Sequence, residues 1–265
     1  MHPSSPPGSL YAAVAARLRA AGCVFAEDEA RLLIEAAVTP DDLDARVGQR
    51  VAGVPLEQVL GWAEFCGLRI AVDPGVFVPR RRTEFLVRQA IGLAPPRPVI
   101  VDLCCGSGAV GAALAAALDP AELHASDIDP AAVRCARRNL APAGGHVYCG
   151  DLFEPLPAAL RGRVDILAAN VPYVPTAEVG LLPAEARLHE PRVALDGGSD
   201  GLDVLRRVAA QAPLWLAPGG SLLVEISERQ KGEACDTTRR GGLVPRVARS
   251  AELAVTVLIA SEPTG

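Results

Sequence analysis

A glycine-rich motif, G-x-G-x-x-G, is formed by Gly106, Gly108 and Gly111 in the stretch VDLCCGSGAVG. The motif joins an apolar run that predicts a strand over 99–103 to an alanine-rich run that predicts a helix over 109–118. Glycine loops in this context bind nucleoside cofactors at the amino end of the helix. The pattern alone fits a nicotinamide dinucleotide and other nucleoside cofactors equally well.

Four polar residues, Asp102, Asp127, Asp151 and Asn170, lie at the ends of successive predicted strands. Because the carboxyl ends of parallel strands meet at one edge of a sheet, we expect these side chains to lie close together. The Asp102 carboxylate would repel a pyrophosphate and attract a cation such as S-adenosylmethionine, which carries sulfonium and ammonium groups and no phosphate. Asp127 would bind ribose hydroxyls, and Asp151 the adenine amino group. Each aspartate alone is equally well explained as a helix cap or turn residue, but three together favour a ligand site.

The tetrapeptide Asn170-Val171-Pro172-Tyr173 begins at the fourth of these strand ends. An amide or aromatic amino nitrogen is a weak nucleophile because its lone pair is delocalised. The Asn170 side-chain oxygen and the Val171 carbonyl oxygen would accept both N–H hydrogens of a planar NH2 group and aim its nitrogen at an activated methyl carbon. Tyr173 would form an apolar wall beside that group. The tetrapeptide therefore predicts methyl transfer to a planar nitrogen.

The hydrophobic pattern predicts a scaffold that gathers these strand ends. Apolar residues recur at helical spacing from 10 to about 47, with Gly22 placed to end the first helix. The stretch VLGWAEFCGLRIAV predicts a strand, a turn and a second strand. Further along, short apolar runs alternate with helical stretches, which predicts a mostly parallel sheet covered on both faces. The predicted units are a helical domain over 1–60, to which the family resemblance described below assigns substrate recognition, a β-hairpin linker over 61–82 and an α/β domain over 83–265.

Composition narrows the function classes. Half of the 265 residues are hydrophobic and the net charge is −5, so a large core can be buried and no broad basic face for stable nucleic-acid binding is expected. No apolar run approaches the roughly 18 residues of a membrane span, and no signal peptide is evident. The seven cysteines include no C-x-x-C pair, which argues against a metal site or a disulfide framework. We therefore expect a cytoplasmic protein that does not engage a membrane.

The motifs of residues 99–173 resemble those of class I S-adenosylmethionine-dependent methyltransferases that act on planar nitrogens: DLCCGSG, ASDIDPAAVRCARRN, GDLFEPL and NVPY. FVPRRRTE and HEPRVALDGGSDGL resemble one branch, the protein-(glutamine-N(5)) methyltransferases of peptide-chain release factors. EDEARLLIEAA and PLEQVLGWAEF are similar to that family's helical N-terminal domain and hairpin, so the resemblance covers nearly the whole chain. It implies a Rossmann-like α/β fold with a mostly parallel seven-stranded sheet, S-adenosyl-L-methionine as cofactor, and a release factor as protein substrate of a monomeric enzyme.

The resemblance also implies roles for single residues. The substrate amide would be held by Asn170, Val171, Pro172 and Tyr173. The cofactor site would comprise Asp102, Cys104, Cys105, Gly106, Ser107, Gly108, Asp127, Ile128, Asp151, Leu152 and Asn170. On the substrate side, Phe77, Pro79 and Arg80 would lie over the pocket mouth, while Glu190 and Pro191 would support the substrate loop. For Arg80, Glu84 and Glu190, an ion pair with a structural role is an equal alternative.

Three stretches depart from the family pattern. Val171 stands where the family usually has proline, but a residue that precedes proline is pushed toward extended conformations, so we expect its carbonyl to be presented and activity to survive. Arg81 stands where proline is common, which leaves the local turn geometry and the choice of partner open. After Glu225, the sequence predicts a short polar crossover before the last strands.

Other functions fit parts of the pattern. The same chemistry could act on an exocyclic amino group of a flipped or unpaired nucleic-acid base, or on another protein in a specialised paralogue. A catalytically silent cofactor-binding module would be favoured by loss of Asn170 or Tyr173, and both are present. A nicotinamide enzyme would leave Asp102 and NVPY without a role.

Overall fold

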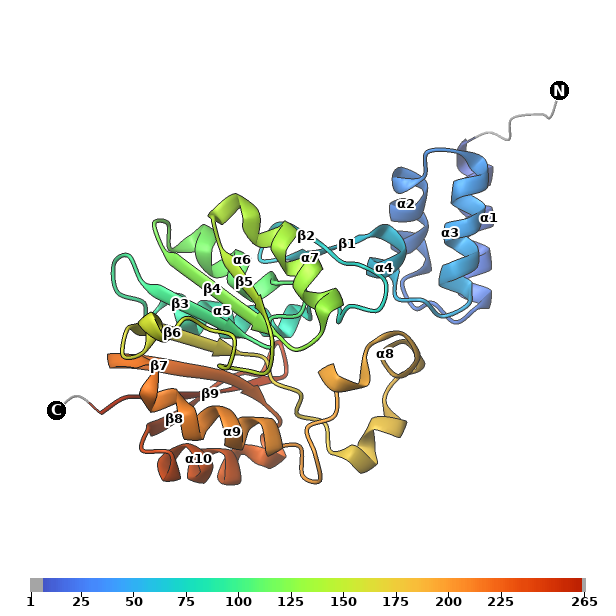
Figure 1. Ribbon diagram of the computed structural model, residues 1–265. Helices are drawn as coiled ribbons and strands as arrows, with labels where there is room; N and C mark the ends of the chain where they lie inside the picture. Colours follow the sequence, from blue (N-terminus) through green and yellow to red (C-terminus); the bar gives the residue numbers. More distant parts are fainter. Residues whose placement is uncertain (1–6, 264–265) are drawn as a thin grey trace.

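The computed structural model describes residues 7–263, and Figure 1 shows a small helical unit joined by a hairpin to a larger α/β unit. The helices of the first unit pack around buried Leu18, Leu33 and Val47. As predicted, the first helix ends before Gly22, whose φ of +91° suits the chain reversal there. The helices are α1 (Pro7–Ala20), α2 (Ala26–Ala36), α3 (Pro40–Val51) and α4 (Leu56–Leu60).

A buried ion pair holds the helical unit together. Arg50 donates to both carboxylate oxygens of Glu29, at 2.6 and 3.2 Å, and both side chains are only 9% exposed. Arg50 also donates to Glu185 at 2.6 Å, in the α/β unit. Gln58 bridges the units as well, because its amide donates to the carbonyls of Val76 and His189. The helical unit is thus tied to the larger unit by polar contacts of buried side chains.

The hairpin forms where the sequence predicts it. Strands β1 (Trp62–Phe65) and β2 (Leu68–Ala71) pair antiparallel, and the two residues between them have positive φ values of 50° and 74°. Positive φ at both central positions is the geometry of a tight hairpin turn. Phe65 and Ile70 are buried in the core of the α/β unit, so the hairpin packs onto that unit.

The α/β unit contains a seven-stranded sheet in the order β5-β4-β3-β6-β7-β9-β8. Neighbours from β5 to β7 are parallel, whereas β9 is antiparallel to both β7 and β8. The predicted Rossmann-like class with a mostly parallel sheet is confirmed. The strands are β3 (Val99–Leu103), β4 (Glu122–Asp127), β5 (His146–Cys149), β6 (Val164–Ala169), β7 (Leu216–Ile226), β8 (Val244–Ser250) and β9 (Val255–Ser261).

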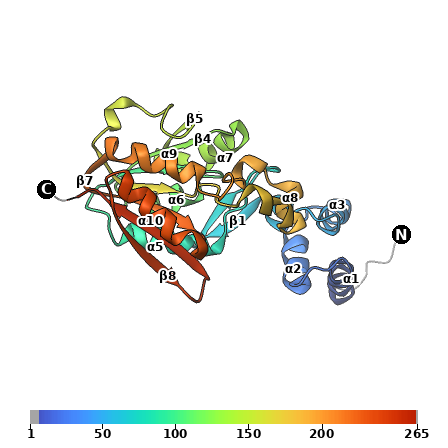
Figure 2. The same cartoon turned by 90° about the horizontal axis from the view of Figure 1, so that it is seen from below.

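Helices cover both faces of the sheet (Figures 1 and 2). One face carries α5 (Glu84–Ile91), α6 (Ala109–Ala117) and α7 (Pro130–Leu140), and the other α9 (Asp203–Gln211) and α10 (Lys231–Arg240). The two-residue period of a strand sorts side chains between the two cores. In β7, Val224 faces the α9 side and Leu223 the α5 side, so Glu225 also points toward α5. The short helix α8 (Ala184–His189) lies beside the helical unit in both views.

The crossover after Glu225 is polar, and it contains a helix that the sequence did not predict. Residues 231–240 form helix α10, and its buried face is made of Ala234 and the polar Thr237 and Thr238. Threonines on an inner face hid the amphipathic pattern, because the helix has few apolar residues to mark its period. Within residues 7–263, no helix is both long and apolar enough to cross a membrane.

Replacing Arg50 by alanine should lower the free energy of unfolding by about 3–5 kcal/mol, because the buried Glu29 carboxylate loses its cation. The double variant Arg50→Ala/Glu29→Ala should lose less than Arg50→Ala alone, since it leaves no buried carboxylate without a partner; Glu185, which also loses Arg50, is half exposed to water. Urea denaturation followed by circular dichroism measures both. Equal losses for the single and the double variant would contradict a buried ion pair.

Candidate active site

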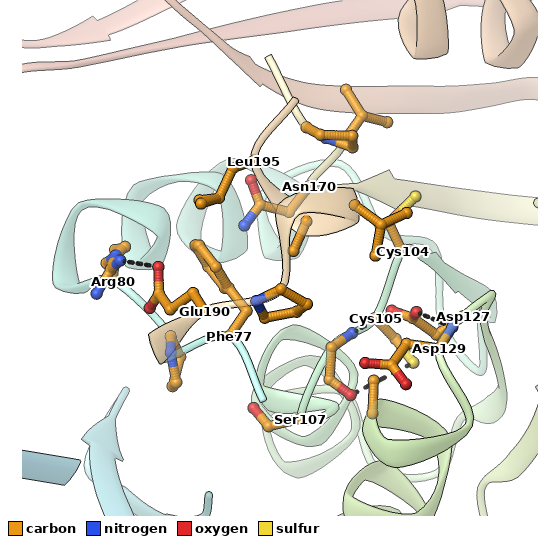
Figure 3. A pocket seen from close by; sticks show the side chains of 18 of the residues that line it. Phe77, Arg80, Cys104, Cys105, Ser107, Asp127, Asp129, Asn170, Glu190 and Leu195 are labelled. Carbon is orange, nitrogen blue, oxygen red and sulfur yellow. Dashed lines mark hydrogen bonds and ion pairs between the residues drawn. The ribbon is translucent and has the colours of Figure 1, made fainter. Parts of the chain in front are cut away.

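A cavity of about 480 Å³ opens at the carboxyl ends of β3, β4 and β6 (Figure 3). Segments 77–83 and 182–195 complete its walls, and Pro55 and Glu57 of the helical unit reach its edge. Of the residues singled out in the sequence, those that line it are Phe77, Pro79, Arg80, Asp102, Cys104, Cys105, Gly106, Ser107, Asp127, Ile128, Asp151, Leu152, Asn170, Val171, Pro172, Tyr173, Glu190 and Pro191.

Gly108 is the exception, because it lies beneath the cavity and not in its wall. Its φ is +79°, and a Cβ there would come within 3.2 Å of Ala136 and Leu140 on α7. The missing side chain therefore lets α7 pack against the start of α6. The assignment of Gly108 to the cofactor stays a prediction, and the structure adds a packing role for its missing side chain.

Asp127 organises the glycine loop from the end of β4. One carboxylate oxygen accepts from the Gly106 backbone N–H at 2.8 Å, and the other from the Asp129 N–H at 2.9 Å. On the other side of the loop, the Asn139 amide donates to the Ser107 carbonyl at 2.8 Å. Burial raises the pKa of Asp127 above its ordinary value. The loop is therefore held by side chains from two different elements before any ligand enters.

Asp102 is buried at the end of β3, and its two oxygens have different surroundings. Oδ2 accepts from the Gly111 N–H at 2.9 Å, whereas Oδ1 has no hydrogen-bond partner among the residues described. Gly111 is in the first turn of α6, where a dinucleotide-binding fold would hold its pyrophosphate. A carboxylate already caps this helix end, so the site repels phosphate and suits a cation. Burial raises the pKa of Asp102 to about 7.

Asp151 forms an ion pair with an arginine that the sequence did not predict. Its Oδ2 accepts from Arg207 of α9 at 2.5 Å, and both residues line the cavity. The next residue, Leu152, has a φ of +50°, and its carbonyl accepts from Ser126 at 2.7 Å. Arg207 carried no signal in the sequence, because it lies 56 positions from Asp151 on an ordinary amphipathic helix.

Asn170 directly follows β6, and its side chain points into the cavity between Leu195 and Phe77 (Figure 3). Neither its amide nor the Val171 carbonyl hydrogen-bonds to another group of the described chain. Val171 and Pro172 are buried, which restricts the backbone at this point. The segment therefore has a side-chain acceptor and a backbone acceptor that its own fold leaves unused.

The glycine-rich loop over 195–202 packs against the NVPY segment and bonds to the backbone that follows it. The backbone N–H of Gly197 donates to the Val174 carbonyl at 2.8 Å, and that of Val174 to the Leu195 carbonyl at 3.1 Å. A Cβ at Gly197 would lie 2.6 Å from the Pro172 carbonyl oxygen, and one at Gly201 would overlap that of Tyr173. The LDGGSDG motif is thus explained by close backbone contact with residues 172–174.

The FVPR and HEPR motifs meet in one ion pair. The Glu190 side chain is fully buried and accepts from the Val78 N–H at 3.1 Å and from Arg80 at 2.6 Å. Arg80 in turn lies over the Phe77 ring, 4.8 Å from its centroid. Desolvation is the largest influence on Glu190 and raises its pKa. The Arg80–Glu190 ion pair joins two walls of the cavity. It therefore has the structural role given above as the alternative, and both residues also line the site.

A second buried carboxylate, Glu225 of β7, escaped sequence reasoning. It accepts from Arg82 at 2.7 Å, from the Thr83 hydroxyl at 2.7 Å and from the Tyr173 hydroxyl at 2.9 Å. Arg82 also donates to the Tyr173 hydroxyl at 2.6 Å. Burial and the Glu225 charge raise the pKa of Tyr173 to about 12. The available signal was a single charged residue in the otherwise apolar run SLLVEI.

Arg81, the residue in place of a common proline, occupies the first position of a 3-10 turn over Arg81–Thr83. Proline is tolerated at such a position because its missing N–H would have no partner there. Arginine adopts the same turn, and its side chain is exposed. The turn geometry that the sequence left open is therefore formed without proline.

Comparisons with known proteins identify the family. The Methyltransferase small domain model matches residues 67–199. The chain is 42% identical over 194 residues to a release factor glutamine methyltransferase of Geobacter sulfurreducens, covering 71% of this chain and 67% of the relative. The corresponding enzyme of Deinococcus radiodurans is 35% identical, over 86% of this chain and 88% of its own. This chain belongs to the release factor glutamine methyltransferase family. Its fold matches a methyltransferase from Pyrococcus furiosus with a TM-score of 0.56 at 16% identity, covering 83% and 97% of the two chains.

The methyltransferase uses S-adenosylmethionine, and the cavity fits this cofactor. The unpartnered Oδ1 of Asp102 offers a buried acceptor to a cationic group. Each arginine of the lining is already paired with a carboxylate: Arg80 with Glu190, Arg82 with Glu225 and Arg207 with Asp151. Within the described part of the chain, Asp102 and Asp127 therefore line the cavity without a cationic partner and no lining arginine is free, which suits a positively charged ligand.

Cofactor affinity of the methyltransferase should rise with pH between about 6 and 8, by at most about tenfold per pH unit. The Asp102 pKa of about 7 lies above that of an unfolded aspartate, so the folded free protein holds this group protonated below pH 7. A bound cation favours the charged form and must displace that proton. Calorimetry in buffers of different ionisation enthalpy should show proton release near pH 6.5, and Asp102→Asn should abolish that component. Identical proton release in the variant would contradict the role of Asp102.

Gly201→Ala should reduce the rate of methyl transfer about 100-fold, because the added Cβ overlaps the Tyr173 carbonyl and displaces the NVPY backbone. Gly219→Ala is the matched control. Gly219 has a φ of +79° against +77° at Gly201, and nothing lies within 4 Å of its added Cβ. Both variants carry the same backbone strain, but only Gly201→Ala should lose activity in a radiolabelled-methyl assay. Parallel losses would assign the effect to strain alone.

Proposed function

We propose that this methyltransferase transfers a methyl group from S-adenosylmethionine to the side-chain amide nitrogen of a glutamine in a peptide-chain release factor. The observation that carries the proposal is the pair of acceptors at Asn170 and Val171 that the fold leaves unused, in two residues that line the same cavity as Asp102 and the glycine loop. The names of the curated relatives support the choice of substrate.

The substrate glutamine enters with its NH2 group toward the Asn170 side-chain oxygen and the Val171 carbonyl oxygen. Two acceptors in fixed positions select a planar NH2, because each takes one of its N–H hydrogens. Both hydrogen bonds strengthen as positive charge develops on the nitrogen, so the acceptors stabilise the transition state more than the bound substrate. Asn170 and Val171 thereby orient the nitrogen and increase its nucleophilicity.

When bound, S-adenosylmethionine supplies an electrophilic methyl group on a sulfonium sulfur. Asn170 and Val171 would hold the amide nitrogen in line with that methyl carbon, so that the nitrogen–carbon bond would form as the carbon–sulfur bond breaks and leaves its electron pair on sulfur. The nitrogen then releases one proton to water, so no base with a tuned pKa is required. Phe77, Leu195 and Tyr173 line this part of the cavity with apolar surface and exclude water from the reacting atoms.

Within this proposal, the helical unit, over 1–60, is a substrate-recognition domain. Pro55 and Glu57 of this unit reach the cavity edge, and Arg50 is bonded to Glu185 on α8, which also lines the cavity. A protein whose glutamine enters the cavity would therefore touch both units. The proposal also includes a monomeric enzyme, and a cytoplasmic one because its substrate would be a translation factor.

The direct test is incubation of the purified chain with isotopically labelled S-adenosylmethionine and a purified release factor, followed by peptide mass spectrometry. The expected product is one methyl group on a glutamine side chain. A parallel reaction contains total RNA and DNA in place of the protein. Label in nucleic acid and none in the release factor would overturn the proposal in favour of base methylation.

In the same assay, Asn170→Ala should lower kcat about 100- to 1,000-fold, the range found for the loss of one transition-state acceptor or donor. Cofactor affinity measured by calorimetry should stay within about twofold, because the lost contact is to the substrate. Asn170→Asp is the matched control: it keeps an oxygen but adds charge, so it should recover only part of the rate. Equal losses of rate and cofactor affinity would contradict this role of Asn170.

A further inference from the structure

We propose that Glu225 is a positioning residue of this methyltransferase, which fixes the Tyr173 side chain against the substrate and so sets the rate of methyl transfer. The inference rests on the proposed function, since Tyr173 belongs to the NVPY segment. Glu225 lies on β7 and its side chain, 3% exposed, is not part of the cavity lining, so it acts through Tyr173.

Burial makes the presence of a carboxylate at 225 informative. A charged group taken out of water costs several kcal/mol unless each oxygen is paired, and an apolar side chain would serve the core at least as well. Both oxygens of Glu225 are used: Oε1 accepts from Arg82 and Tyr173, and Oε2 from Thr83. Three partners from two segments converge on one side chain, so the carboxylate is a junction between the 81–83 turn and the NVPY segment.

Tyr173 borders open space. It lines the cavity, and the same residue also borders a second hollow of about 470 Å³ together with Leu181, Leu182 and Gln230. Polar contacts at the hydroxyl can therefore contribute to holding the ring in place. The hydroxyl is held by Arg82 as donor and by Glu225 as acceptor, which fixes the outer end of the ring.

The backbone of Tyr173 is fixed separately. The Gln230 amide donates to the Tyr173 carbonyl and to the Asp200 carbonyl, each at 2.9 Å, and its oxygen accepts from the Ser227 N–H. Loss of Glu225 should therefore release the ring while the backbone of the segment stays in place. This separation predicts a loss of rate with little change in cofactor binding.

The test compares Glu225→Gln, which keeps the shape and removes the charge, with Tyr173→Phe, which removes the hydroxyl. Each should lower kcat about 10- to 100-fold, with the cofactor dissociation constant changed less than about twofold. The double variant should be no slower than the slower single variant, because Glu225→Gln weakens and Tyr173→Phe removes the same hydrogen bond. Multiplicative losses, or an unchanged kcat in Glu225→Gln, would overturn the proposal. Should Glu225→Gln fail to fold, Tyr173→Phe tests the same contact, and full activity there would overturn it.

Ser221→Ala is the control for general destabilisation. Ser221 is buried on the same strand and bonds Ser261 at 2.9 Å, outside the cavity lining. Its loss should lower the unfolding temperature while kcat stays unchanged. A similar fall of kcat in this variant would assign the effect of Glu225→Gln to stability and contradict positioning.

A measurement without substrate separates this inference from the proposed function. The chain has three tyrosines, so labelling with 3-fluorotyrosine gives three fluorine resonances, and Tyr173→Phe assigns one of them. In Glu225→Gln the Tyr173 resonance should shift or broaden, while those of Tyr11 and Tyr148 stay unchanged. An unaltered Tyr173 signal would overturn the positioning role even if release factor methylation is observed. If the wild-type chain methylates no release factor, the resonance still tests the contact.

Discussion

Two buried carboxylates fix segment 77–83, and the shape of the catalytic cavity depends on them. Glu190 accepts hydrogen bonds from the Val78 N–H and the Arg80 guanidinium, while Glu225 accepts one from Arg82. A buried charge that loses its partner is costly, so each pair specifies one position of the backbone between them. The same two residues also connect to α8 and to the NVPY segment. Segments distant in the sequence are thereby joined around one opening by charge pairing.

Electrostatics also explain why this glycine loop suits a cation although its pattern matches that of dinucleotide enzymes. In both cases the amino end of a helix carries partial positive charge from unpaired N–H groups. Here the Asp102 carboxylate supplies negative charge at this helix end, because it accepts a hydrogen bond from the Gly111 N–H. The second oxygen of that carboxylate has no partner among the described residues, so it is available to a cationic ligand. One acidic residue before the loop thus reverses the charge that the site accepts.

The sequence predicted those parts of the site that follow from local pattern. Strand ends are visible as apolar runs, so the pattern alone places Asp102, Asp127, Asp151 and Asn170 at one edge of the sheet. Contacts between distant segments left no such pattern: Arg207 pairs with Asp151 across 56 positions, and Glu225 meets Thr83 across 142. Gly108 has a clear local pattern, but the pattern does not reveal its packing role. A glycine within a binding motif can also be required by helix packing. Spacing identifies a loop, but the role of each residue in it depends on its neighbours in space.

The surrounding contacts also explain how the site tolerates valine at 171 and arginine at 81. Proline would restrict φ at either position through its ring. At 171, the surroundings restrict the backbone instead. The valine side chain is buried, a proline follows it, and the 195–202 loop contacts residues 172–174. At 81, the bonds of Arg82 and Thr83 to Glu225 fix the turn that a proline would favour. A backbone held by tertiary contacts no longer needs local rigidity, so both substitutions are compatible with the same cavity.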